Sequence, residues 1–300
     1  MRARGALNDT RIRLRKMTIA YRPAERTGGL GAKRPAGSAA DEIAFLRKFG
    51  LEVALTQIDR YITAVTELLQ KILKEQHAPM QEAARLFADT VDKGNSIYIT
   101  GCSHSSIIAQ ETFYRAGGFL LMNPIFLPGM TLETFPPTIT SKYERISGIA
   151  EAVLSESGAG PGDAMVIVSI SGRNTVPIEM AQWAKARGAK VVALTSVEYS
   201  GSVDSRHDSG KRLYELADIV LDVMCEPGDA VLAIAGLEGK TGPTSSVTGI
   251  AIMHAVISQT VELLIGRGIQ PPVFRSANLD GADEYNRKLL ERYKDQIHYM

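Results

Sequence analysis

The chain has 300 residues, 45% of them hydrophobic, so it is long enough to build one large domain or two small ones around a buried core. This composition excludes collagen, disulfide-scaffold and wholly disordered proteins. The net charge of +1 argues against a protein whose main task is to bind a nucleic-acid backbone, so we do not expect nucleic acid as a partner.

The first 40 residues differ in charge from the rest. They hold ten Lys and Arg against two Asp and Glu, a surplus of eight, while the remaining residues have a deficit of seven. Gly and Pro interrupt this segment and no helical or strand period runs through it, so we expect residues 1–40 to form a basic, disordered extension. A basic arm for nucleic acid and a later start at Met17 are the alternatives.

A helical hairpin is predicted over residues 41–94. Apolar residues recur in steps of four and three from Leu51 to Ile72, which is typical of a helix packed nearly parallel to another helix. A second helix is predicted from Pro79 to Asp92, ending at Gly94. The spacing leaves open whether the first helix joins two copies of the chain or covers its own domain.

Beyond residue 95, short β-rich segments alternate with helical ones. The predicted strands are Ser96–Thr100, Ala164–Ile170, Lys190–Thr195 and Asp218–Val223, and the predicted helices are Ser105–Ala116, Lys142–Ser155, Thr175–Arg187, Lys211–Leu216 and Ser246–Ile265. Strands that are apolar throughout are buried on both faces, as in parallel sheets. We therefore predict that residues 95–300 form a three-layer α/β/α domain with a central parallel sheet, doubly wound and flavodoxin-like, preceded by the helical hairpin.

The two cysteines, Cys102 and Cys225, are too few for a disulfide framework, and we interpret them as free thiols in a reducing compartment. No apolar run approaches the ~20 residues that cross a bilayer, and the N-terminus lacks the apolar stretch of a secretory signal. We expect a cytoplasmic protein with no membrane partner.

Three hydroxyl-rich loops open predicted helices. We call them the first loop (GCSHSS, residues 101–106), the second loop (SISGRNT, 169–175) and the third loop (TGPTSSVTG, 241–249). Each combines Gly, which lets the backbone approach closely, with hydroxyl donors at a helix N-terminus, where free N–H groups and the dipole attract an anion. Hydrogen bonds to a charged partner contribute roughly 1.5–3 kcal/mol each, so three or four donors suffice for a monophosphate without a metal.

Other phosphate and catalytic motifs fail on spacing. Residues 236–241 (GLEGKT) look like the end of a Walker loop, but Ile234 stands where its first glycine is required. No G-x-G-x-x-G follows a strand, and the second loop lacks the leading glycine of a nucleophile elbow. The histidines show no paired spacing with Cys or Glu, so we expect neither a metal nor a cofactor.

The first and second loops resemble those of the sugar isomerase (SIS) domain, a phosphosugar-binding module whose most specific element is a Ser-x-Ser-Gly loop. The third loop is similar to the Thr-Gly-Ser-Thr segment of N-acetylmuramic acid 6-phosphate etherases. Stretches that resemble uncharacterised SIS-domain proteins lie at residues 111–118, 205–218 and 274–286. The resemblance covers residues 49–293, and it implies a phosphosugar ligand and a homodimer or dimer-based tetramer that often binds ligand between subunits.

The resemblance also implies which residues contact the phosphate. The candidates are Ser103, Ser105 and Ser106 of the first loop, Ser169, Ser171 and Asn174 of the second, and Thr244 and Ser245 of the third. Asn174 stands where many phosphosugar isomerases have Ser or Thr, and an asparagine still donates a hydrogen bond or caps a helix.

Isomerisation needs a base that removes a carbon-bound proton and an acid that protonates oxygen. Glu111 lies seven residues after His104, so the two can share one helix face; we take Glu111 as the candidate base and His104 as the candidate acid. Alternatively, Glu111 forms a surface ion pair with Arg115, which follows it by four residues. Phosphoheptose isomerases have their catalytic glutamate at the position that Arg115 holds in this chain. Glu238 is the competing carboxylate, and His254 is interpreted as a core or interface histidine.

These residues favour a metal-independent isomerase of the aldose–ketose type acting on a monophosphorylated sugar or amino sugar. Cleavage of the lactyl ether of N-acetylmuramic acid 6-phosphate is the near alternative, prompted by the third loop. A phosphosugar sensor without catalysis is the alternative from another class, and it would account for the missing glutamate at the isomerase position.

Overall fold

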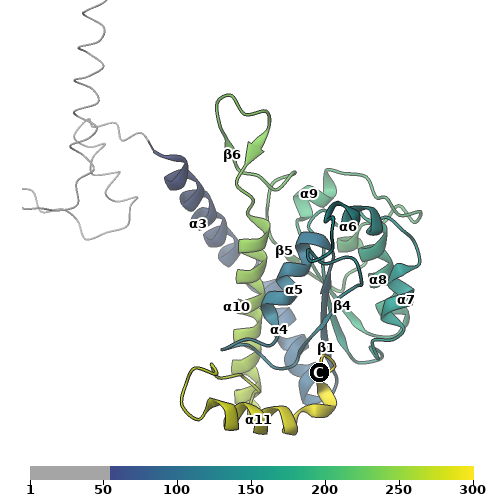
Figure 1. Ribbon diagram of the computed structural model, residues 1–300, viewed down its shortest axis with the longest axis vertical. Helices are drawn as coiled ribbons and strands as arrows, with labels where there is room; N and C mark the ends of the chain where they lie inside the picture. Colours follow the sequence, from purple (N-terminus) through teal and green to yellow (C-terminus); the bar gives the residue numbers. More distant parts are fainter. Residues whose placement is uncertain (1–54) are drawn as a thin grey trace, which may run out of the picture. The chain divides into compact units, whose positions relative to one another are not determined.

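The computed structural model describes residues 55–300, which form one of two units of the chain. The predicted basic extension, residues 1–40, and the start of the predicted hairpin lie outside the described residues. Within them, the helical hairpin is present as α3 (Gln57–Glu75) and α4 (His77–Asp92) (Figure 1). Helix α3 begins at a capping box, in which the Thr56 hydroxyl accepts from the Asp59 backbone N–H and the Asp59 carboxylate accepts from the Thr56 N–H.

The centre of the fold is a five-stranded parallel sheet with the order β2-β1-β3-β4-β5. Its strands are β1 (Ile97–Gly101), β2 (Met122–Ile125), β3 (Ala164–Val168), β4 (Lys190–Thr195) and β5 (Ile219–Asp222). This order is that of flavodoxin-like doubly wound sheets, so the predicted fold class is confirmed. In such sheets the carboxyl ends of the strands form the edge where ligands bind.

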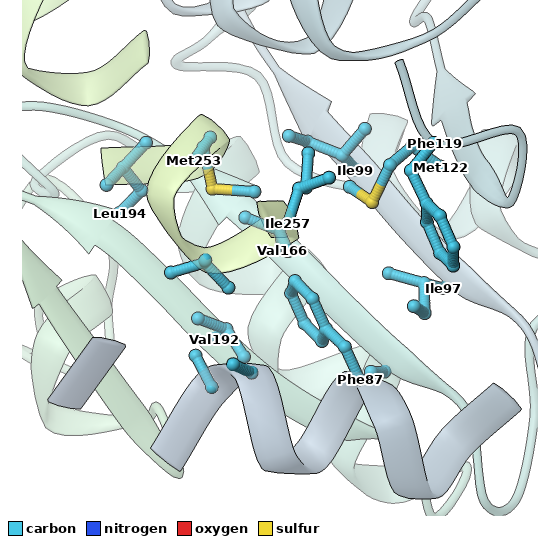
Figure 2. Close-up of a cluster of buried hydrophobic side chains, with 14 of the residues drawn as sticks. Phe87, Ile97, Ile99, Phe119, Met122, Val166, Val192, Leu194, Met253 and Ile257 are labelled. Carbon is cyan, nitrogen blue, oxygen red and sulfur yellow. The ribbon is translucent and has the colours of Figure 1, made fainter. Parts of the chain in front are cut away.

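Helices cover both faces of the sheet. One face packs against α4, α5 (Ser106–Thr112) and α10 (Ser245–Gly266), and the other against α7 (Ile149–Leu154) and α8 (Thr175–Ala186) (Figure 1). Figure 2 shows the first of these cores, where Phe87 of α4 lies against strand side chains that include Val166, with Met253 and Ile257 of α10 close by. Full burial of such side chains stabilises the fold by roughly 1.5–3 kcal/mol each.

Four details differ from the predictions. The helix expected over Ser105–Ala116 is the shorter α5, which ends at Thr112. Strand β2 was not predicted. The helix expected over Lys142–Ser155 is two short helices, α6 (Thr138–Tyr143) and α7, because the chain turns at Gly148 with a φ of 88°, which favours glycine. The helix expected over Lys211–Leu216 is only the 3-10 turn η2 (Leu213–Glu215).

The remaining elements are η1 (Ser103–Ser105), α9 (Val197–Gly201), the two-stranded hairpin of β6 (Leu232–Ala233) and β7 (Lys240–Thr241), α11 (Ala282–Arg292) and η3 (Lys294–Gln296). Helix α10, the long helix drawn vertically to the left of α4 and α5 in Figure 1, is the one described helix that is long and apolar enough to cross a membrane by length and composition. In this fold it packs against α4 and α5 and contributes to the first core.

Candidate functional site

The first loop turns sharply at the end of β1. A side chain at Gly101 would place its Cβ 2.7 Å from the carbonyl oxygen of Ser105, so only glycine allows this turn. The Ser103 hydroxyl donates to Thr140 Oγ1 (2.6 Å), and the Ser106 hydroxyl donates to the Ser103 carbonyl (2.7 Å). Within the described residues, Ser105 makes no side-chain hydrogen bond, so it is the first-loop serine whose hydroxyl is free to donate to a ligand.

The second loop leaves two hydroxyls without partners in the described part of the chain. Ser169 is buried and Ser171 is half-buried, and neither side chain hydrogen-bonds to the protein. Gly172 has a φ of 56°, and a Cβ there would lie 2.9 Å from Ser200 Oγ, so the turn requires glycine. The predicted phosphate contacts of Ser169 and Ser171 remain predictions, and their donors are available.

Asn174, at the end of the same loop, is already engaged on both sides of its amide. Its Nδ2 donates to Glu144 Oε2 (2.5 Å), and its Oδ1 accepts from Arg206 Nη1 (2.8 Å). The amide therefore orients its neighbours. Its second Nδ2 hydrogen makes no hydrogen bond within the described residues, so the phosphate contact of Asn174 stays a prediction.

Three arginines gather at this point, and the sequence reasoning missed them. Arg173 belongs to the second loop, and the backbone N–H of Arg206 donates to its carbonyl. Arg145 directly follows Glu144, and the Glu144 carbonyl accepts from the N–H of Val176 in the first turn of α8. Burial and the positive charges of Arg173 and Arg145 lower the pKa of Arg206. Glu144 is the acidic group among them, so the arginine cluster (Arg145, Arg173 and Arg206) leaves an excess of positive charge beside the second loop.

The third loop is occupied by the protein's own carboxylate. Asp229 Oδ1 accepts from the backbone N–H groups of Thr244 (3.0 Å) and Ser245 (2.9 Å), and Oδ2 accepts from Ser245 Oγ (2.5 Å). The anion attraction predicted for this helix N-terminus is thus satisfied internally. Thr244 and Ser245, both buried, are predicted phosphate contacts whose donors are engaged here.

The candidate base Glu111 lies at the end of α5, and its neighbour across the helix interface is His254 of α10. Glu111 Oε1 and His254 Nε2 are 3.4 Å apart. Arg115 forms an ion pair with Glu111 and lies 3.5 Å from His254 Nε2. Burial, followed by the nearby Arg115 charge, lowers the pKa of His254, which favours its neutral form.

The other two catalytic candidates lie elsewhere. His104 is exposed in η1, ahead of α5, and no hydrogen bond joins it to Glu111 in the described structure. His104 precedes α5, which begins at Ser106, so the pairing of His104 with Glu111 on one helix face stays a prediction. Glu238 is exposed in the turn between β6 and β7. The histidine that lies beside Glu111 is instead His254, which the sequence analysis interprets as a core or interface histidine.

Comparison with known proteins agrees with the fold and the loops. A family model described as the SIS domain matches residues 60–196. A UPF0309 protein of Oceanobacillus iheyensis is 47% identical over 246 residues, covering 82% of this chain and 100% of its own length. A UPF0309 protein of Streptomyces griseus is 44% identical over 241 residues, covering 80% and 96% respectively.

Among solved structures, a phosphoheptose isomerase from Francisella tularensis aligns with 70% of this chain and 100% of its own, at 18% identity and a TM-score of 0.47. That likeness is too distant to bear on function. The sequence relatives are close and nearly complete in length, and the loops that resemble the SIS domain lie at the carboxyl edge of a sheet of the expected order. The chain therefore belongs to the UPF0309 family of SIS-domain proteins.

Proposed function

We propose that this protein binds a phosphorylated sugar or amino sugar in the cytoplasm and isomerises it by proton transfer, without a metal. Its membership of a SIS-domain family supports the ligand class. The unengaged hydroxyls of Ser105, Ser169 and Ser171 supply donors for a phosphate, and the arginine cluster supplies charge that a dianion would neutralise.

The observation that carries the proposal of catalysis is the pairing of Glu111 with His254. Glu111 lies about 7.5 Å beyond Ser106 along the axis of α5, since a helix rises about 1.5 Å per residue. The first and second loops together would hold the phosphate, and Glu111 would remove the proton from the carbon next to the sugar carbonyl. His254 would give a proton to the carbonyl oxygen, which yields an enediol. Glu111 would then return its proton to the former carbonyl carbon, and the hydroxyl on the carbon that was deprotonated first would pass its proton back to His254 as the new carbonyl forms.

The free cysteines are not candidates for the chemistry. Both are buried, and burial raises the pKa of each thiol, that of Cys225 to about 12. A thiol of such high pKa is protonated and a poor nucleophile at neutral pH. Buried, reduced cysteines are in keeping with a reducing compartment.

The test is exchange of carbon-bound hydrogen when the protein is incubated in deuterated water with hexose, hexosamine and heptose phosphates. We expect exchange with at least one of them, reduced about 100-fold or more by Glu111→Gln and by His254→Gln, since a positioned acid or base typically contributes 10²–10⁴ in rate. Glu198→Gln, which changes an exposed carboxylate on α9, should leave exchange unchanged. Absence of exchange across the panel would contradict isomerisation.

A phosphosugar sensor is the second candidate, and the ion pair between Arg115 and Glu111 favours it, because a carboxylate held by a guanidinium is a weaker base. Tight phosphosugar binding that Glu111→Gln does not alter, without exchange, would decide for the sensor.

Lactyl-ether cleavage rested on the third loop, whose donors Asp229 engages. Release of lactate from N-acetylmuramic acid 6-phosphate is its test.

We also propose that the protein is a homodimer. Large apolar side chains are exposed on α3 and α10, namely Ile58, Ile62, Leu73, Val247 and Ile265. Exposed apolar side chains that gather on one helix mark interaction surfaces. Light scattering should give the mass of two chains, and Ile58→Glu with Ile62→Glu should shift it toward one; a monomeric wild type would contradict the proposal.

A further inference from the structure

A separate pocket lies between the end of α5 and the C-terminal segment. It has a volume of about 360 Å³, and its lining includes Tyr114, Arg115, Phe274, Arg275, Asp283 and Arg287. Pockets of about 300–1,000 Å³ hold small molecules. None of the predicted phosphate contacts lines it, so it is distinct from the three loops.

The walls of this pocket are held by the backbone. The Gly117 N–H donates to the Phe274 carbonyl (2.9 Å), and the Phe274 N–H donates to the Gly118 carbonyl (3.0 Å). The Asn286 amide bonds both the N–H of Arg275 (3.0 Å) and its carbonyl (2.9 Å). These paired hydrogen bonds fix the C-terminal segment against the end of α5, so the pocket is formed before any ligand enters.

Charge and aromatic surface meet in this pocket. Its lining carries Arg115, Arg275 and Arg287 with Asp283, and outside the lining Glu111 pairs with Arg115 and Glu284 with Arg287. The side chain of Tyr114 is 60% exposed, and its ring meets that of Phe274 edge-on at 5.4 Å. Arg275 stacks over the ring of Tyr285 at 3.9 Å and has no carboxylate partner among the described residues. Guanidinium groups are suited to phosphate, and exposed aromatic faces are suited to rings.

We propose that this pocket is a second small-molecule site, which binds a phosphate ester that carries a ring. Arg275 and Arg115 engage the phosphate, and Tyr114 contacts the ring. Because Arg115 also holds Glu111 in an ion pair and lies 3.5 Å from His254, an anion in the pocket competes for Arg115 and releases the carboxylate of Glu111. The occupant of this site therefore controls the state of the Glu111–His254 pair.

The experiment uses the full chain with Ser169→Ala and Ser171→Ala, which remove two donors of the second loop and leave the pocket intact. Calorimetry with glucose 6-phosphate and with AMP separates a sugar phosphate from a nucleotide as the source of the ester; glucose, adenosine and inorganic phosphate are the controls. We expect one of the two esters to bind more tightly than all three controls. Adding Arg275→Gln should weaken that binding about tenfold or more, as expected for loss of a charged hydrogen bond.

Tyr114→Ala should also weaken binding, whereas Arg292→Gln, an exposed arginine of α11 outside the pocket lining, should not. Binding of the ester should shift the His254 ring resonances, and Arg275→Gln should abolish that shift. Failure of both esters to bind, or binding indifferent to Arg275→Gln and Tyr114→Ala, would overturn the site. Unmoved His254 resonances would overturn its coupling to the pair. The proposed function fails separately, if the wild-type chain neither binds nor exchanges any sugar phosphate.

Discussion

Replacing Asp229 tests whether the third loop is an anion-binding site that the carboxylate of Asp229 occupies. In the structure its carboxylate accepts from two backbone N–H groups at the start of α10 and from the hydroxyl of Ser245. Losing a helix cap costs roughly 0.5–2 kcal/mol, and leaving a buried donor unpaired costs roughly 1–3 kcal/mol. Allowing for overlap between the two, we expect Asp229→Gly to lower the free energy of unfolding by about 2–3 kcal/mol.

Glycine is the right replacement because Asp229 has a φ of 51°, where other residues would add strain of their own. The loss corresponds to a fall in Tm of roughly 4–10 °C, measured by thermal unfolding. Asp229→Asn keeps one oxygen acceptor and should fall between the variant and the wild type. An anion that enters the vacated cradle stabilises the fold by mass action, so sulfate should raise the Tm of Asp229→Gly more than that of the wild type.

Two results would refute this reasoning. If Asp229→Gly were as stable as the wild type, the hydrogen bonds of its carboxylate would contribute nothing to α10. If sulfate stabilised the variant and the wild type equally, the third loop would have no affinity for anions beyond that of the whole surface.

Three further predictions concern the first loop, the arginine cluster and the contact of Arg115 with His254. Gly101→Ala places a Cβ against the backbone of Ser105, so it should destabilise the fold by about 1–3 kcal/mol in thermal unfolding; an unchanged Tm would contradict the turn. Arg206→Gln should weaken phosphosugar binding about tenfold and reduce its salt dependence in calorimetric titrations, and unchanged affinity would exclude a role for the arginine cluster. Arg115→Gln should raise the pKa of His254 toward 6.5 in a titration of its ring resonances. Since the pKa of His254 is lower in the native protein, the unfolded chain binds a proton at this histidine more readily than the native chain does. The free energy of unfolding should therefore be unaffected by His254 above pH 6.5 and fall as the pH drops below 6.5. This fall should be smaller in Arg115→Gln.

The sheet was largely predictable because four of its strands are apolar on both faces. A run such as Ala164–Val168, every residue of which is buried, has no other stable place in a fold of this size. Strand β2 escaped because its sequence, MNPI, contains Asn123 and Pro124. Pro124 is tolerated because β2 is an edge strand. Asn123 is buried, and its Nδ2 donates to the carbonyls of Ile97 (3.2 Å) and Gln296 (3.1 Å).

The loops were predictable for a local reason, and the partners of their side chains were not. Each loop can be recognised from a segment of six to nine consecutive residues, in which hydroxyl residues lie beside glycine at the start of a helix. The contact of Glu111 with His254 joins positions 143 apart, and that of Asn174 with Arg206 joins positions 32 apart. Spacing along the chain carries no signal for pairs that only the packing of α5 on α10, or of one loop on another, brings together.

The second and third loops show how far this missing information decides function. By sequence they are alike, since each sets hydroxyls at the N-terminus of a helix, and the helix dipole attracts an anion to both. In the folded chain the carboxylate of Asp229 binds Thr244 and Ser245 of the third loop. The arginine cluster lies beside the second loop. At the third loop, an external phosphate finds the donors already bound to Asp229 and is repelled by its negative charge. At the second loop, it finds unpaired hydroxyls and an excess of positive charge. The second loop is therefore where a phosphorylated ligand should bind, and substitutions there should change affinity far more than substitutions at Thr244.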